Sequence, residues 1–206
     1  MKKIRVADVI VDFLVTKKVD TIFGLMGGGA MFLNDALALR SDKIKTIFNH
    51  HEQASSMAAV GYSKMKNGIG AAMFTTGCGS TNAVTGVLDA WQDNLPCIFI
   101  SGQVKRKETS RNIRPKTHLR NFGVQEADII SIVENITKYS KMINEPNDIY
   151  KELEKAYHIA VSGCPGPVWL DIPLDVQAAP VTKKRWSGLS KVNSPYKSKL
   201  LSLIHI

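Results

Sequence analysis

The sequence contains little cysteine, few aromatic residues and no long hydrophobic run. Three cysteines among 206 residues exclude a disulfide-stapled scaffold. No apolar stretch approaches the roughly 20 residues that a membrane helix requires, so we expect no membrane partner. Asp8 and Asp12 interrupt the apolar residues after the basic start of the chain, which argues against a signal peptide. We therefore expect a cytoplasmic globular protein whose thiols are reduced.

The excess of basic residues is confined to two segments. The formal net charge is +9, but seven basic residues fall between Lys105 and Arg120 and six more between Lys183 and Lys199. No aromatic residues alternate with the charges of the first segment, as a stacking platform for bases would require. We therefore expect no nucleic-acid partner.

The apolar pattern alternates between helical and strand periodicity. Such alternation predicts an α/β fold, with an open parallel sheet of about six strands and helices on both faces. The expected helices are residues 6–17, 31–39, 52–66, 81–91 and 146–162. The expected strands are residues 21–23, 44–48, 69–74, 97–100 and 168–172.

Residues 1–180 are predicted to form one domain, because the apolar periodicity ends near Pro180. Residues 105–123 form a polar, basic stretch within it that is long for an internal loop, which predicts a segment that is either functional or mobile. Residues 181–200 are rich in Lys, Ser, Gly and Pro, which is the composition of a linker, here one leading to a central domain that the sequence lacks. The abrupt apolar end, residues 201–206, is predicted to be a non-native cloning or assembly scar.

Three loops that follow predicted strands carry residues suited to ligand binding. A glycine-rich turn includes Gly27 and Gly28, where the backbone could approach a ligand closely or simply pack. Glu52 opens the helix at 52–66, where the helix dipole alone would favour an acid. Two adjacent histidines precede it, but neighbouring helical positions diverge and no third ligand is spaced for a metal, so we expect none.

The third loop, residues 75–82, contains Thr75, Cys78 and Asn82. It lacks the lysine of a phosphate-binding P-loop, and Cys78 would need a nearby base to act as a nucleophile. Taken one at a time, these loops do not specify a function.

In their order and spacing, however, the loops resemble the N-terminal, pyrimidine-binding (PYR) domain of thiamine-diphosphate enzymes, specifically the acetolactate synthase large-subunit family. The resemblance extends from about residue 4 to residue 179. The segments that carry it are 51–62, 75–82, 93–96, 101–104, 125–128, 137–138 and 166–173.

The resemblance implies a cofactor, a reaction and a role for each site residue. Glu52 would hydrogen-bond the aminopyrimidine ring of thiamine diphosphate and promote loss of the proton on the thiazolium carbon, which then attacks a 2-keto acid such as pyruvate. Gln125 would donate to the reacting carbonyl. The cofactor would be bound by Gly27, Gly28, Glu52, Thr75, Cys78 and Asn82.

The resemblance also implies what lies outside this sequence. In the family, Mg²⁺ holds the diphosphate in a separate C-terminal domain, and FAD occupies a central domain in many members. The active site forms between subunits of a homodimer or homotetramer. These 206 residues are therefore predicted to be inactive alone, as a truncated carboligase or decarboxylase, or as the PYR subunit of a naturally split 2-keto acid decarboxylase.

Departures from the family pattern leave the acceptor substrate open. Leu25 and Met26 replace a Tyr-Pro pair, and Cys78 stands where acetolactate synthases usually have proline. The turn at residues 27–31 is more similar to relatives in bacterial surface-polysaccharide synthesis, so a keto sugar is an alternative acceptor. A non-catalytic binding module is a further alternative, although the presence of Glu52 argues against it.

Overall fold

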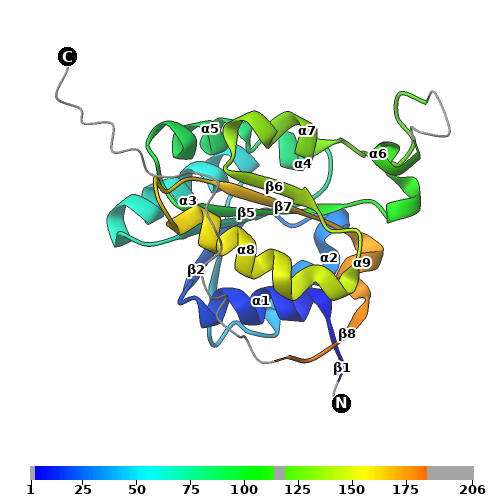
Figure 1. Ribbon diagram of the computed structural model, residues 1–206, viewed down its shortest axis with the longest axis horizontal. Coiled ribbons are helices and arrows are strands. Elements are labelled where there is room, and N and C mark those ends of the chain that lie inside the picture. Colours follow the sequence, from blue (N-terminus) through cyan, green and yellow to red (C-terminus); the bar gives the residue numbers. More distant parts are fainter. Residues whose placement is uncertain (1–2, 114–118, 185–206) are drawn as a thin grey trace.

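The computed structural model describes residues 3–113 and 119–184, and it is built around a six-stranded sheet in which all strands are parallel (Figure 1). The strand order is β3-β2-β4-β5-β7-β6. The strands are β2 (Thr21–Gly24), β3 (Lys45–Phe48), β4 (Gly70–Phe74), β5 (Cys97–Gln103), β6 (Tyr139–Met142) and β7 (Val168–Pro173). The predicted α/β fold, with a parallel sheet of about six strands between helices, is confirmed.

One face of the sheet is covered by α1 (Val6–Thr16), α2 (Met31–Ala38), α8 (Ile149–Val161) and α9 (Leu174–Ala178) (Figure 1). Most apolar side chains of α1 and α8 recur at helical spacing and are buried against the sheet. Their contacts with Ile98, Ile100 and Leu170 of the central strands form the larger of two hydrophobic cores.

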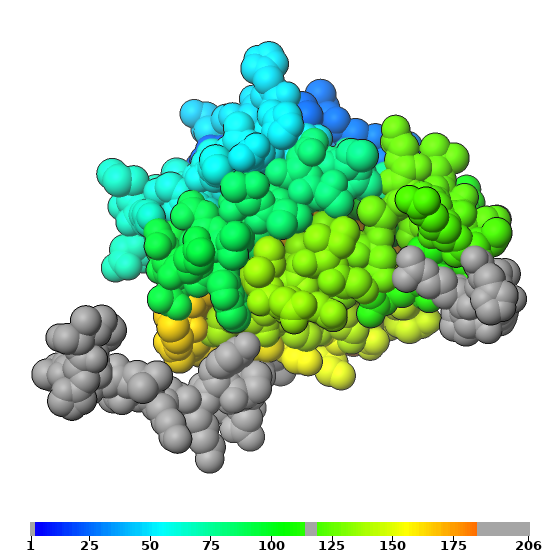
Figure 2. All heavy atoms as spheres, turned by 90° about the horizontal axis from the view of Figure 1, so that it is seen from above, coloured from blue at the N-terminus to red at the C-terminus, as the bar shows by residue number. Residues whose placement is uncertain are grey.

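The opposite face is covered by α3 (Glu52–Lys66), α5 (Val84–Gln92) and α7 (Ile129–Val133). Figure 2 looks onto this layer, in which α3 is cyan, α5 green and α7 yellow-green. Three stacked aromatic rings, those of Phe74, Phe99 and Trp169, lie beneath it with centroids 5.6–6.2 Å apart. This second core fixes the strand ends from which the functional loops emerge.

Several elements differ from the sequence prediction. The expected helix at 81–91 is two helices, α4 (Cys78–Thr81) and α5, so helical structure already begins inside the predicted loop. The sixth strand, β6, was not located from the sequence. The polar stretch at 105–123 contains two short helices, η2 (Arg106–Glu108) and α6 (Ser110–Ile113). The remaining 3-10 turns are η1 (Gly28–Ala30), η4 (Glu134–Ile136) and η5 (Pro146–Asp148).

A second, two-stranded sheet joins the first and last described segments. β1 (Lys3–Arg5) pairs antiparallel with β8 (Pro180–Thr182). The predicted linker is described only as far as residue 184, and the predicted tail, residues 201–206, lies outside the described residues. In the part of the chain that the structure describes, no helix has the length and apolar character needed to cross a membrane.

Candidate functional site

The three predicted loops meet at one edge of the sheet. Each follows the carboxyl end of a strand: the glycine turn follows β2, Glu52 begins α3 after β3, and Thr75 follows β4. Because these strands are neighbours and parallel, their ends lie side by side. Open α/β sheets bind their ligands at this edge.

Glu52 is turned inward at the first turn of α3, and its residue is only 7% exposed. His51 caps this helix, since its Nδ1 accepts a hydrogen bond of 3.1 Å from the backbone N–H of Gln53. The side-chain amide of Asn82 donates to Glu52 Oε2 at 3.0 Å. One carboxylate oxygen is therefore held in place by Asn82.

The other oxygen, Glu52 Oε1, faces Gly79. A Cβ atom at Gly79 would lie 3.2 Å from this oxygen and 2.5 Å from Thr75 Cγ2. Only a residue without a side chain can occupy this position while Thr75 and Glu52 keep their places. Gly79, which sequence reasoning did not select, thereby allows its loop to lie directly against Thr75 and the Glu52 carboxylate.

Thr75 links this region to the glycine turn. Its Oγ1 accepts a hydrogen bond of 3.1 Å from the backbone N–H of Gly29. A Cβ atom at Gly27 would come within 2.5 Å of Thr75, so the two loops touch there, whereas the same position at Gly28 is open. Gly27 therefore packs against the second loop, and Gly28 presents exposed backbone beside it.

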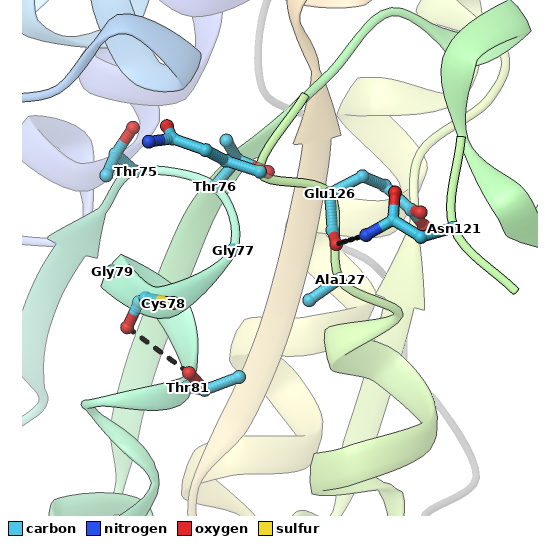
Figure 3. Close-up of a pocket in the computed structure, with 10 residues that line it drawn as sticks. Thr75, Thr76, Gly77, Cys78, Gly79, Thr81, Asn121, Glu126 and Ala127 are labelled. Carbon is cyan, nitrogen blue, oxygen red and sulfur yellow. Dashed lines mark hydrogen bonds between the residues drawn. The ribbon is translucent and has the colours of Figure 1, made fainter. Parts of the chain in front are cut away.

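A cavity of about 370 Å³ adjoins Thr75 and Gly79. Figure 3 shows Thr76 and Gly77 on one side of it and Glu126 and Ala127 on the other. The wall also includes Cys78, Thr81, Asn121 and Gln125. The structure thus brings Gln125 and Cys78, both exposed, to the same cavity, which borders the residues around Glu52.

The backbone conformations on both sides of the cavity are unusual. Gly77 has a φ of 65°, and Gln125, which is not a glycine, has a φ of 60°. A Cβ atom at Gly77 would lie 1.9 Å from the carbonyl oxygen of Gln125. The two loops are therefore in direct backbone contact, and only glycine fits at position 77.

A buried polar cluster lies behind this cavity, and sequence reasoning gave its members no role. It comprises Ser101 and Gln103 on β5 and Trp169 and Asp171 on β7. Burial raises the pKa of the Asp171 carboxyl to about 7, although hydrogen bonds from Ser101 and Gln103 oppose the rise. The available signal was the presence of polar residues within strands that are otherwise apolar.

Among the residues that the structure describes, potential metal ligands are not clustered at this edge. Within residues 3–113 and 119–184, no group of three or more His, Cys, Asp or Glu side chains is arranged to hold a metal ion. The polar groups that converge on the site are instead carboxylate, amide and hydroxyl groups, which suit hydrogen bonding to an organic ligand.

Comparison with known proteins agrees with this geometry. The family model described as thiamine pyrophosphate enzyme, N-terminal TPP binding domain, matches residues 4–141. The chain is 38% identical over 173 residues to the acetolactate synthase large subunit of Corynebacterium glutamicum, covering 84% of this chain and 26% of that protein. It is 35% identical over 171 residues to the chloroplastic acetolactate synthase of Arabidopsis thaliana, covering 83% and 24%.

The large subunit from Lactococcus lactis gives a similar result, with 35% identity over 189 residues, or 89% of this chain and 31% of that protein. The chain thus spans about a quarter to a third of the length of these curated relatives. The resemblance of its loops to acetolactate synthase large subunits is confirmed. The chain belongs to the thiamine pyrophosphate enzymes, and the part of that family it matches is the N-terminal TPP-binding domain.

Proposed function

We propose that this chain is the pyrimidine-binding domain of a thiamine-diphosphate-dependent 2-keto acid decarboxylase or carboligase, and that Glu52 activates the cofactor. The observation that carries the proposal is the buried Glu52 carboxylate, which has one oxygen held by Asn82 and the other beside Gly79. A carboxylate fixed in this way is suited to receive a hydrogen bond from a ring nitrogen of a bound heterocycle.

The residues present fit a planar aminopyrimidine. Close packing of Gly27 and Gly79 against Thr75 brings the glycine turn and the second loop together beside the Glu52 carboxylate. The hydroxyl of Thr75, the thiol of Cys78 and the amide of Asn82 add polar but uncharged groups at this position. We expect these residues, with Gly28, to hold the cofactor, which when bound supplies a carbon nucleophile and an electron sink for decarboxylation.

Each proposed role follows from the chemistry of the side chain. Glu52 Oε1 would hold a proton in a hydrogen bond with the ring nitrogen, while Asn82 keeps the carboxylate from rotating. Gln125, which is exposed on the cavity wall, would donate its amide N–H to the carbonyl oxygen of the substrate. Developing negative charge on that oxygen is stabilised by a donor positioned in advance.

The remaining functions are proposed to lie outside these 206 residues. Relatives several times longer than the matched region support a diphosphate site, with its Mg²⁺, on another domain or subunit. We propose pyruvate as the 2-keto acid, a homodimer or homotetramer as the assembly, and the cytoplasm as its location. FAD would be carried, where present, by a further domain, and the 206 residues alone would be inactive.

The proposal is tested by replacing Glu52 with Gln in the complete enzyme and measuring thiamine-diphosphate-dependent turnover of pyruvate. Loss of the proton-holding group is expected to lower kcat by ~10²-fold or more. Glu154→Gln is the matched control, because Glu154 is similarly buried, at 4% exposed, but lies on α8 in the other helical layer. Unchanged turnover in Glu52→Gln would refute the assigned role, whereas Glu154→Gln should retain kcat within about twofold.

A further inference from the structure

We propose that Gln103 is a positioning residue that fixes the two walls of the cavity relative to each other and so orients Gln125. The inference rests on the proposed function, because it concerns the residue expected to contact the substrate. Gln103 lies at the end of β5, is only 2% exposed and does not itself line the cavity. It therefore acts through the loops in front of it.

The side-chain amide of Gln103 uses its full hydrogen-bonding capacity. Its Oε1 accepts from the Thr76 hydroxyl at 2.7 Å and from the backbone N–H of Val104 at 3.0 Å. Its Nε2 donates to the carbonyl oxygen of Ala127 at 2.8 Å and to Asp171 Oδ2 at 3.0 Å. Two hydrogens and two lone pairs are all engaged, so a single orientation of the amide is satisfied.

The two bonds that reach forward join opposite walls of the cavity. Thr76 belongs to the loop that contains Gly77 and Gly79, and Ala127 belongs to the loop that contains Gln125. Figure 3 shows these two loops facing each other. One rigid amide plane thus spans from the wall beside Glu52 to the wall that carries Gln125.

The bonds that reach backward anchor the amide to the sheet. Asp171 on β7 also accepts from Ser101 Oγ at 2.6 Å, and Ser101 in turn accepts from Trp169 Nε1 at 2.8 Å. Trp169 is fully buried in the aromatic stack between the sheet and its second helical layer. The position of the loops is therefore tied, through Asp171 and Ser101, to a fully buried part of the core.

The conformation of Gln125 explains why such an anchor is needed. A non-glycine residue at a φ of 60° persists only where its surroundings hold it. Contact with Gly77 holds its carbonyl side, and the bond from Gln103 to Ala127 holds the chain two residues further on. Loss of Gln103 should release Gln125 from the conformation that directs its side chain.

The first test uses Gln103→Glu and Thr76→Val in the complete enzyme. Gln103→Glu keeps the acceptor for Thr76 but loses the donor to Ala127 and places a second carboxylate beside Asp171. Thr76→Val removes the other forward bond with little change of shape. Both are expected to lower kcat at least tenfold and to change KM for pyruvate less than threefold, because the lost interaction is made in the transition state.

Thr137→Val is the matched control. Thr137 is as buried as Thr76, at 5% against 7% exposed, and its hydroxyl donates to the carbonyl oxygen of Val133 at 2.9 Å, on α7. It should lose similar thermal stability to Thr76→Val while keeping kcat within twofold. Equal kcat in Thr76→Val, Gln103→Glu and Thr137→Val would overturn the proposal.

A second readout does not depend on the cofactor. Hydrogen exchange measured on the 206-residue chain should rise at least tenfold at amides 76–79 and 121–127 in Thr76→Val, and not in Thr137→Val. If this holds but the wild-type enzyme shows no thiamine-dependent turnover, the proposed function fails and the coupling of the two loops stands. If turnover is present and exchange is the same in both variants, the positioning role fails alone.

Discussion

Raising the pH from 5 to 8 is expected to destabilise the protein through one carboxyl group, that of Asp171. This residue is 1% exposed, and burial raises its pKa from the ordinary 3.8 to about 7. Between these two values the folded state binds more protons than the unfolded state, so the free energy of unfolding falls as the pH rises. Integrated from pH 5 to pH 8, this difference in bound protons lowers the free energy of unfolding by roughly 2–3 kcal/mol.

The matched variant is Asp171→Asn, which cannot ionise but keeps an oxygen able to accept from Gln103 Nε2. Urea unfolding of both proteins at pH 5, 6, 7 and 8, followed by fluorescence and far-UV circular dichroism, separates this group from all others. The wild-type free energy of unfolding should fall relative to that of Asp171→Asn, mainly above pH 5. Parallel pH profiles for the two proteins would refute the reasoning.

Three further predictions concern local features. His51→Ala should lower the free energy of unfolding by about 1 kcal/mol, since it removes the cap of α3; His51→Asn should recover it in the same denaturation assay. Gly77→Ala should lower the free energy of unfolding by more than about 2 kcal/mol, because Gly77 has a positive φ and an added Cβ would clash with Gln125. Gly61→Ala should instead raise the free energy of unfolding by ~0.5–1 kcal/mol, because Gly61 is exposed on α3 and an added Cβ meets open space. A higher melting temperature for Gly77→Ala than for Gly61→Ala would contradict this. Burial raises the pKa of Cys97 to about 12, so Ellman's reagent at neutral pH should titrate only the two exposed thiols of the native protein, and rapid reaction of all three would contradict it.

The parts of the fold that the sequence predicts well are those with strong local signals. The helix expected at 52–66 matches α3 residue for residue, since its start has a glutamate in the first turn and its end has Asn67 in the left-handed conformation. β6 was not located because Tyr139–Met142 is a partly exposed edge strand with two polar residues, so it shows no apolar run. The pairing of β1 with β8 joins distant segments, which no local pattern can specify.

The candidate site likewise has features that the sequence predicts and features that it does not. Glu52, Thr75 and Gly27 come together because each follows a parallel strand, and that follows from topology alone. The roles of Gly79 and Gln103 depend on distances between loops that are far apart in sequence. Both residues can be read from the sequence, but the contacts that assign them a role form only when the strands are paired in register.

The antiparallel pair of β1 and β8 has a practical consequence for protein engineering. Because Lys3 and Thr182 are direct partners across this small sheet, a bridge of a few residues could join them covalently in a variant shortened to residues 3–182. New ends could then be opened in the exposed turn at residues 41–43, between α2 and β3. Such a circular permutant would leave every parallel strand and every loop around the Glu52 carboxylate uninterrupted.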